Sequence, residues 1–284
     1  MIRFWIVSKP REGDSKENFD YQWGCVHVAL MLTTRSVMRG FHRYVQHRVP
    51  DGIEHHTFPY AFSSRNWYSC SDHVLDNIQA LTEGIFGDEE YPRRMQPHKF
   101  GADDFVLELT SGGDLIASAP GFARGRGGVK LLNFIKRSDA VSQQDFELWW
   151  RHTYAPCVAN AVAAGLVLAY SQSTQLPLEA SSFGGTLFER GGVQTYAGIE
   201  ELWFSDMPSI STFTECLDGY IRSADVEQHI DSAGSFSMPT VERVVFDQSD
   251  KRYRPAILDP ATIESSAHDQ ERKWGEWNKV FPVS

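Results

Sequence analysis

The chain has 284 residues, of which 42% are hydrophobic and 23% are charged, a balance typical of a folded globular protein. Its formal net charge of −10 excludes a broad basic surface for nucleic acid. No run approaches the roughly 20 apolar residues of a membrane helix, and the N-terminal apolar stretch is too short for a secretory signal. The four cysteines form no CxxC pair, so we expect reduced thiols in a cytoplasmic protein without a metal site.

An internal repeat begins at the first predicted strand. IRFWIVSK, at residues 2–9, aligns without a gap with VKLLNFIK, at residues 129–136. Both runs are short and rich in β-forming residues, so they predict the first strand of each half. Ser15 and Ser142 follow at matching places and predict helix N-caps, because a serine side chain can accept a hydrogen bond from the first turn.

Each predicted helix carries a stripe of three ring-bearing side chains at steps of four residues. Such steps place the three on one face, because residues i and i+4 lie one above the other. The stripes are Phe19, Trp23 and His27 in the first copy and Phe146, Trp150 and Tyr154 in the second. The first copy therefore offers an imidazole where the second offers a phenol.

Second strands follow as HRYVQH and LAYSQS, in which tyrosine and glutamine share a face because side chains alternate along a strand. These pairs either line a cavity or fill an interface between sheets, and we expect the interface because both copies retain them. The pairs are Tyr44 with Gln46 and Tyr170 with Gln172. Each strand leads into a polar excursion, at 48–64 and 174–195.

The remaining elements complete the same order in both halves. Third strands are predicted at about 65–70 and at 196–204, followed by helices at about 72–82 and 209–223 and final strands at 105–110 and 241–246. Each half is therefore expected to be a β-α-β-β-α-β unit with a ferredoxin-like fold. The fold class is α+β, with two such repeats packed sheet to sheet as an intramolecular pseudo-dimeric α/β barrel. Because the halves are fused, we expect a monomer or a weak homodimer.

The expected domains follow from the repeat. They are a first domain at 1–112, a glycine-rich linker at 113–128, a second domain at 129–247 and a C-terminal extension at 248–284. We interpret the extension, which ends in KWGEWNKVF, as an arm that docks on the body.

The second half resembles the EthD family of dimeric α/β-barrel proteins. The resemblance rests on LLNFIKR, the capped helix with FELWWRHTYAP, then AYSQS and YAGIEELWF. Trp150, Arg151, Ala155 and Pro156 fit the family's helix motif, while its histidine is Tyr154 here. In the first half the resemblance rests on the internal alignment, which places His27 at the histidine position.

This resemblance implies a small-molecule protein, since EthD-like proteins and their barrel relatives include cofactor-free cyclases, dehydratases, isomerases and oxygenases. More distant relatives bind haem. It also implies that the cavity lies between sheet and helices, lined by the face that bears His27 or Tyr154. Fold alone does not fix function.

Three residues are the catalytic candidates. An imidazole at His27 can move a proton near neutral pH, although a buried histidine satisfied by a backbone carbonyl is the structural alternative. The Tyr154 phenol can donate a hydrogen bond to an oxyanion but is a poor base; a packed aromatic is the alternative here. Tyr44 or Gln46 would then steady a developing enolate.

Further residues are expected to line the substrate site. Glu200 and Glu201 are consecutive on one predicted strand, so one faces inward, near Tyr154, as a candidate proton acceptor. The expected lining residues are Trp23, Gln46, Trp67, Trp150, Tyr170, Glu200 and Trp203. His98 is the residue on which a haem alternative depends, although no haem-specific spacing supports it.

The leading hypothesis from the sequence is a cofactor-free lyase or isomerase of the dehydratase or cyclase type. It would act on an apolar aromatic or polyketide-like small molecule, with His27 moving a proton α to a carbonyl. A cofactor-independent monooxygenase on the same scaffold is the alternative enzyme, and a small-molecule or haem-binding protein is the non-catalytic alternative.

Overall fold

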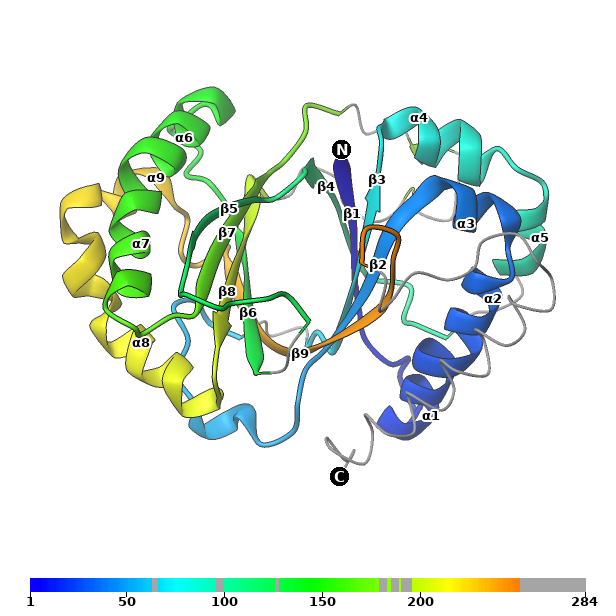
Figure 1. The fold of residues 1–284 in the computed structure, drawn as a ribbon, viewed down its shortest axis with the longest axis horizontal. Helices are drawn as coiled ribbons and strands as arrows, with labels where there is room; N and C mark the ends of the chain where they lie inside the picture. Colours follow the sequence, from blue (N-terminus) through cyan, green and yellow to red (C-terminus); the bar gives the residue numbers. More distant parts are fainter. Residues whose placement is uncertain are drawn as a thin grey trace.

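The computed structural model describes residues 1–62, 66–95, 100–125, 128–178, 183–184, 189 and 196–250. The part of the C-terminal extension from residue 251 onward, and His98, lie outside these residues. One curved antiparallel sheet forms the centre of the protein, and two groups of helices, one from each half, cover its outer face at opposite ends of the molecule (Figure 1). The α+β class and the antiparallel sheet are thus as the sequence predicts.

The first half supplies four strands and the helices on one side. The strands are β1 (Ile2–Ser8), β2 (Phe41–Arg48), β3 (Ser69–Leu75) and β4 (Val106–Ser111). The α-helices are α1 (Lys16–Tyr21), α2 (Val28–Leu32), α3 (Arg35–Gly40), α4 (Ile78–Leu81) and α5 (Glu90–Met95). π-Helical turns at η1 (Gln22–His27) and η3 (Thr82–Phe86) and a 3₁₀ turn at η2 (Ile53–His55) complete it.

The second half repeats this plan on the other side. Its strands are β6 (Val129–Ile135), β7 (Ala169–Thr174), β8 (Gly198–Phe204) and β9 (Phe236–Asp247), preceded by β5 (Asp114–Ser118). Its helices are α6 (Gln143–Trp149), α7 (Ala155–Ala163), α8 (Met207–Ile221) and α9 (Val226–His229), with a π turn η4 (Trp150–Tyr154) and a 3₁₀ turn η6 (Arg222–Ala224). Within the described residues, no helix is long and apolar enough to cross a membrane.

Strand pairing gives both halves the same order. The sheet runs β4-β1-β3-β2-β9-β6-β8-β7-β5, so the first half and the second half each have their strands in the order fourth, first, third, second. The long strand β9 joins them, because its start pairs with β6 and its end with β2. Both N-cap predictions hold: Ser15 accepts from the Asn18 amide and Ser142 from the Asp145 amide, at 3.1 Å in each case.

The pairing does not close into a barrel. β5 lies within the segment expected to be a linker and pairs with residues 169–172 of β7, which occupies most of that edge. β4 reaches only the end of β7: Thr110 forms a bridge with Gln175, and the Leu176 amide donates to the Leu109 carbonyl at 2.8 Å. The sheet is therefore strongly curved but open.

The third strand of the first half differs from its prediction. It covers Ser69–Leu75 instead of residues 65–70, and the helix expected to begin at residue 72 begins at Ile78. A buried aspartate and histidine made residues 72 and 73 poor strand candidates by sequence. The fold accommodates Asp72 because Arg3, on the neighbouring strand, donates to both of its carboxylate oxygens at 3.0 and 2.5 Å.

The two excursions pack on each other's halves. Phe58 and Tyr60, from the first, lie in the hydrophobic core of the second half. Phe183, from the second, is fully buried in the core of the first half, where its ring stacks on Phe4 with centroids 6.5 Å apart. Each helix-covered core is therefore completed by the other half's excursion.

Candidate functional site

A π turn sets the shape of each repeated helix at the expected stripe. η1 ends at His27 and η4 ends at Tyr154, so both wide turns contain the tryptophan of the stripe and the residue four positions later. Single π turns inside α-helices are often found at functional sites. Trp23 and Trp150 are both buried and point to the sheet.

Under each tryptophan, the same hydrogen bonds recur. The Gln46 side-chain amide donates to the Trp23 carbonyl at 3.0 Å and to the Tyr44 hydroxyl at 2.9 Å. In the second half Gln172 donates to the Trp150 carbonyl at 3.3 Å and to the Tyr170 hydroxyl at 2.6 Å. The tyrosine–glutamine pairs therefore face the helices, and the expectation that they fill an interface between sheets is wrong.

The two sites differ at the position of the third strand that lies opposite the glutamine. Gln46 pairs across the sheet with Ser71, and Gln172 pairs with Glu200. The Ser71 hydroxyl accepts from the Trp23 indole at 3.1 Å. In the second half the corresponding residue is Glu200, so that half has an ionisable acid beneath its tryptophan.

Glu200 is held by polar neighbours in a fully buried position. The Tyr170 hydroxyl donates to one carboxylate oxygen at 2.8 Å, and the Asn133 amide donates to the other at 3.2 Å. Asn133 is in turn fixed by the Ser237 hydroxyl at 2.8 Å. Burial raises the pKa of Glu200 to about 7, although the hydrogen bonds from Tyr170 and Asn133 oppose the shift. The group can therefore take or give a proton near neutral pH.

Two further phenols complete this cluster. Burial and the nearby Glu200 charge raise the pKa values of Tyr154 and Tyr60, which also interact with each other. Tyr60 comes from the first half's excursion, and its amide donates to Ser237 at 3.1 Å. A carboxyl group with three phenols, Tyr60, Tyr154 and Tyr170, can move a proton and then donate hydrogen bonds to an oxyanion.

The first half has a different lining. The Tyr44 ring stacks on His73 with centroids 4.5 Å apart, and His73 Nδ1 lies 3.1 Å from the Phe4 carbonyl oxygen. Burial lowers the pKa of His73 to about 4 and raises that of Tyr44 to about 12. Both groups are therefore neutral at physiological pH. His27 is half-buried, with its ring 5.0 Å from that of Phe100.

Two predicted lining residues, Trp67 and Trp203, lie away from both tyrosine–glutamine pairs or on the opposite face of the sheet. Glu201 and Trp203 are on the face turned away from the helices, where Lys130 lies 4.4 Å from the Trp203 ring centroid. Trp67 precedes β3 and lines a surface cleft of about 600 Å³ together with Phe58, Tyr60 and Phe62. The structure thus brings Trp150, Tyr154, Tyr170 and Glu200 together, and separately Trp23, Tyr44 and Gln46.

Four residues of the two sites were not found by sequence reasoning: Asn133, Ser71, His73 and Tyr60. A signal for Asn133 was present, because it is the one uncharged polar residue in the run VKLLNFIK. Ser71 and His73 fell in a strand read partly as a helix. Tyr60 had no local signal, since only the exchange of excursions brings it to the second half.

The chain was compared with known families, curated proteins and solved structures. Residues 138–233 match the sequence model of the EthD domain. The crystal structure of an anthrone oxidase-like protein superposes with a TM-score of 0.52 at 9% identity, covering 86% of this chain and 92% of that chain. A candidate monooxygenase from Lactobacillus acidophilus gives 0.43 at 10% identity, covering 85% and 93%. No curated protein matches the sequence.

At such low identity the structural likeness concerns the fold alone, and the family match lies wholly within the second half. It includes η4, β7 and β8, and therefore the helix and strands that carry Tyr154, Tyr170 and Glu200. Residues 138–233 of this chain are similar to the EthD domain.

Proposed function

We propose that the chain is a cofactor-free enzyme that removes a proton from an apolar aromatic or polyketide-like small molecule at Glu200. The observation that supports this is the fully buried carboxyl group with a pKa of about 7, surrounded by phenols. Such a group is neither fully ionised nor fully protonated at neutral pH, as a general acid–base requires.

The reaction class we favour is oxygenation without a cofactor. Glu200 takes a proton from a CH₂ group beside a carbonyl, and Tyr170 and Tyr154 stabilise the enolate. Oxygen adds to the carbanion, and the peroxide anion takes the proton back. Loss of the second C–H proton, with cleavage of the O–O bond, then gives a ketone and water, so R₂CH₂ and O₂ become R₂CO and H₂O. The structural neighbour described as anthrone oxidase-like supports this choice over a lyase.

Tyr60 marks the access route to Glu200. It lines two surface clefts, the one of about 600 Å³ beside Trp67 and one of about 590 Å³ beside Leu217 and Arg222. Both volumes are in the range of small-molecule sites. The aromatic lining of the first, with Phe58, Phe62 and Trp67, suits an aromatic substrate. We place substrate binding there, with movement of the Tyr60 side chain opening the way to Glu200.

The repeated strand order and the repeated hydrogen bonds support a duplicated origin. We propose that both halves descend from one EthD-like unit and that their fusion makes within one chain what a homodimer makes from two, so that the protein is a monomer or a weak dimer. In this proposal the second half holds the working site, since Ser71 cannot replace Glu200 as a base. His27 is the alternative base in the first half.

The test uses anthrone as the probe substrate, with oxygen uptake and absorbance as readouts. We expect uptake of one O₂ per ketone formed, and a loss of at least roughly 100-fold in kcat in Glu200→Gln. Glu215→Gln, an exposed substitution on α8, is the matched control and should leave the rate unchanged.

Other outcomes decide between the alternatives. Equal turnover under nitrogen would favour the lyase or isomerase reaction. Loss of turnover in His27→Gln but not in Glu200→Gln would move the site to the first half. A Soret band in the purified protein would support the haem alternative.

A further inference from the structure

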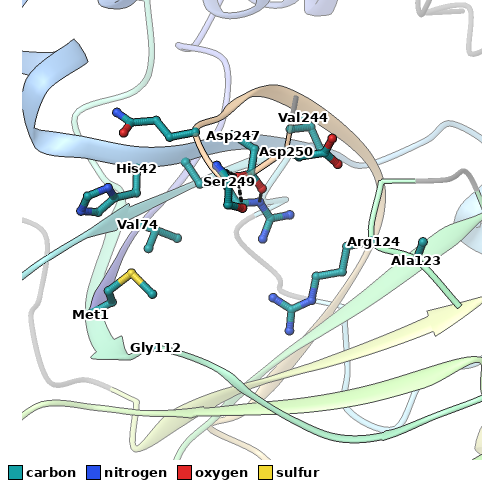
Figure 2. A pocket seen from close by; sticks show the side chains of 12 residues that line it. Met1, His42, Val74, Gly112, Ala123, Arg124, Val244, Asp247, Ser249 and Asp250 are labelled. Carbon is teal, nitrogen blue, oxygen red and sulfur yellow. Dashed lines mark hydrogen bonds and ion pairs between the residues drawn. The ribbon is translucent and has the colours of Figure 1, made fainter. Parts of the chain in front are cut away.

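A large cavity opens on the face of the sheet turned away from the helices. It has a volume of about 920 Å³ and lies where β2 begins and where β3 and β9 end (Figure 2). Met1, Val74 and Val244 form apolar parts of its wall. Arg43 and Arg124 supply positive charge, and Asp247 and Asp250 also line the cavity. Figure 2 shows the Arg124 side chain extending into the open space from the segment after β5. Glu200 is on the other face of the sheet, so this cavity is separate from the site described above.

Both arginines of the cavity have unused hydrogen-bond donors. Arg43 is almost fully buried, and its Nε forms an ion pair with Asp247 Oδ2 at 3.5 Å but no hydrogen bond with a described residue. The other Asp247 oxygen is already occupied by the Ser249 amide and hydroxyl, at 2.8 and 2.6 Å. Arg124 lies over the Trp203 ring at 5.3 Å and forms no hydrogen bond within the described part of the chain.

Arg3 shows how this chain satisfies an arginine that has a structural role. Its guanidinium is fully buried and donates to both oxygens of Asp72 and to Glu201, so that each of its nitrogens has an acceptor. Arg43 and Arg124 have no such set of acceptors. The contrast indicates that these two guanidinium groups have capacity for an acceptor that the described residues do not supply.

The charges around Arg124 also favour an anion in the cavity. Burial lowers the pKa of the Arg124 guanidinium; the Glu201 carboxylate opposes this shift, while the positive charges of Arg3 and Arg43 add to it. Arg43 and Arg124 therefore repel each other across the cavity. An anion placed between them would remove this repulsion and could accept hydrogen bonds from both.

We infer that this cavity binds a small organic carboxylate with an apolar body. The carboxylate lies between Arg43 and Arg124, because planar guanidinium groups pair with carboxylates through two parallel hydrogen bonds. The body lies against Val74, Val244 and Met1. A volume of about 920 Å³ is enough for such a ligand.

The experiment measures binding of 2-naphthoate by calorimetry, with the neutral 2-naphthalenemethanol as a matched ligand. We expect saturable binding of the carboxylate that weakens with rising salt, and at least roughly tenfold weaker binding of the alcohol. Arg124→Gln should weaken binding of the carboxylate by a similar factor. Arg124 is partly exposed, so this variant should fold, which circular dichroism checks.

Arg151→Gln is the matched control, because Arg151 is 54% exposed and pairs with Asp114 outside the cavity. It should bind 2-naphthoate as the unchanged protein does. Three results would each overturn the inference: no saturable binding of the carboxylate, equal binding of the alcohol, or unchanged affinity in both Arg124→Gln and Arg43→Gln. None of these readouts depends on turnover at Glu200, so failure here and failure of the proposed reaction are distinguishable.

Discussion

Arg3 and Lys130 lie at matching positions on the first strands of the two halves and donate hydrogen bonds to the same carboxylate, Glu201. Lys130 Nζ is 2.8 Å from Glu201 Oε2, and Arg3 binds both Glu201 oxygens. Arg3 also binds Asp72, and Lys130 also pairs with Glu242. Burial alone would raise the pKa of Glu201, but the charges of Arg3 and Lys130 hold it well below its usual range. One ion network thus connects the halves on the face away from the helices.

Because of this network, we expect substitution of Arg3 to lower the free energy of unfolding substantially. Arg3→Met leaves Asp72 without its principal cation and removes one of the two cations bound to Glu201, so we expect a loss of about 3–5 kcal/mol in the free energy of unfolding. Urea denaturation measures it. The double variant Arg3→Met/Asp72→Leu should recover part of the loss, because it removes the unpaired aspartate. Equal stability of the single and double variants would show that Asp72 does not depend on Arg3.

The raised pKa of Glu200 predicts a pH dependence of stability. Between about pH 4.5 and 7 the unfolded chain has lost the Glu200 proton while the folded protein retains it, so the unfolded state binds fewer protons. Stability therefore falls as pH rises through this window, by on the order of 3 kcal/mol. Glu200→Gln should abolish this component, as measured by the difference in urea midpoints across the window. Glu215→Gln, with its exposed side chain, should retain it.

The paired tyrosines give a matched test of the hydrogen bond to Glu200. Tyr170→Phe removes a donor that lowers the pKa of Glu200, so this pKa should rise further. Tyr44→Phe makes the same change in the first half, where Ser71 takes the place of the carboxyl group, and should leave the Glu200 titration unchanged. Carbon NMR of labelled glutamate follows both. An unchanged pKa in Tyr170→Phe would contradict the assigned contact.

The lowered pKa of His73 predicts a pH dependence of stability that is opposite in sign to that of Glu200. Burial lowers its pKa to about 4, so between about pH 4 and 6.5 the unfolded chain binds a proton that the folded protein does not. Stability should therefore fall as pH is lowered through this window. His73→Phe keeps a ring beside Tyr44 and should reduce the loss. The comparison of urea midpoints at the two ends of the window measures it, and an identical pH profile in the variant would rule out this role.

Because each excursion packs on the other half, we expect a substitution in one half of the sequence to destabilise the other half. Phe183→Ala opens a cavity beside Phe4 and should cost about 3–5 kcal/mol. Hydrogen exchange should accelerate in β1 and in α4, with little change in α7 and α8. Leu148→Ala, at a side chain that is 53% exposed, is the control. Faster exchange confined to the second half would refute the packing of Phe183 on the first.

The sequence correctly predicts the elements whose signal lies in neighbouring residues, and it misplaces those that depend on distant contacts. The N-caps at Ser15 and Ser142, the repeated stripe and most strands follow from periodicity and capping, and the structure retains them. β3 was misplaced because its buried Asp72 is stabilised by Arg3, which is 69 residues away. The sequence predicts a linker where β5 lies, because glycines surround this short edge strand. The strand gains its stability from pairing with β7.

The sequence by itself determined the repeat and the stripe of Trp150 and Tyr154, because both depend on spacing along the chain. It also placed one of two adjacent glutamates on the inner face, but not which one. Only the tertiary structure decided that Glu200 meets Tyr170 and Asn133 while Glu201 meets Arg3 and Lys130, because the register between strands selects the face. It also decided that Tyr60 belongs to the second half's site, because contacts between an excursion and the other half are set by packing and not by order in the chain.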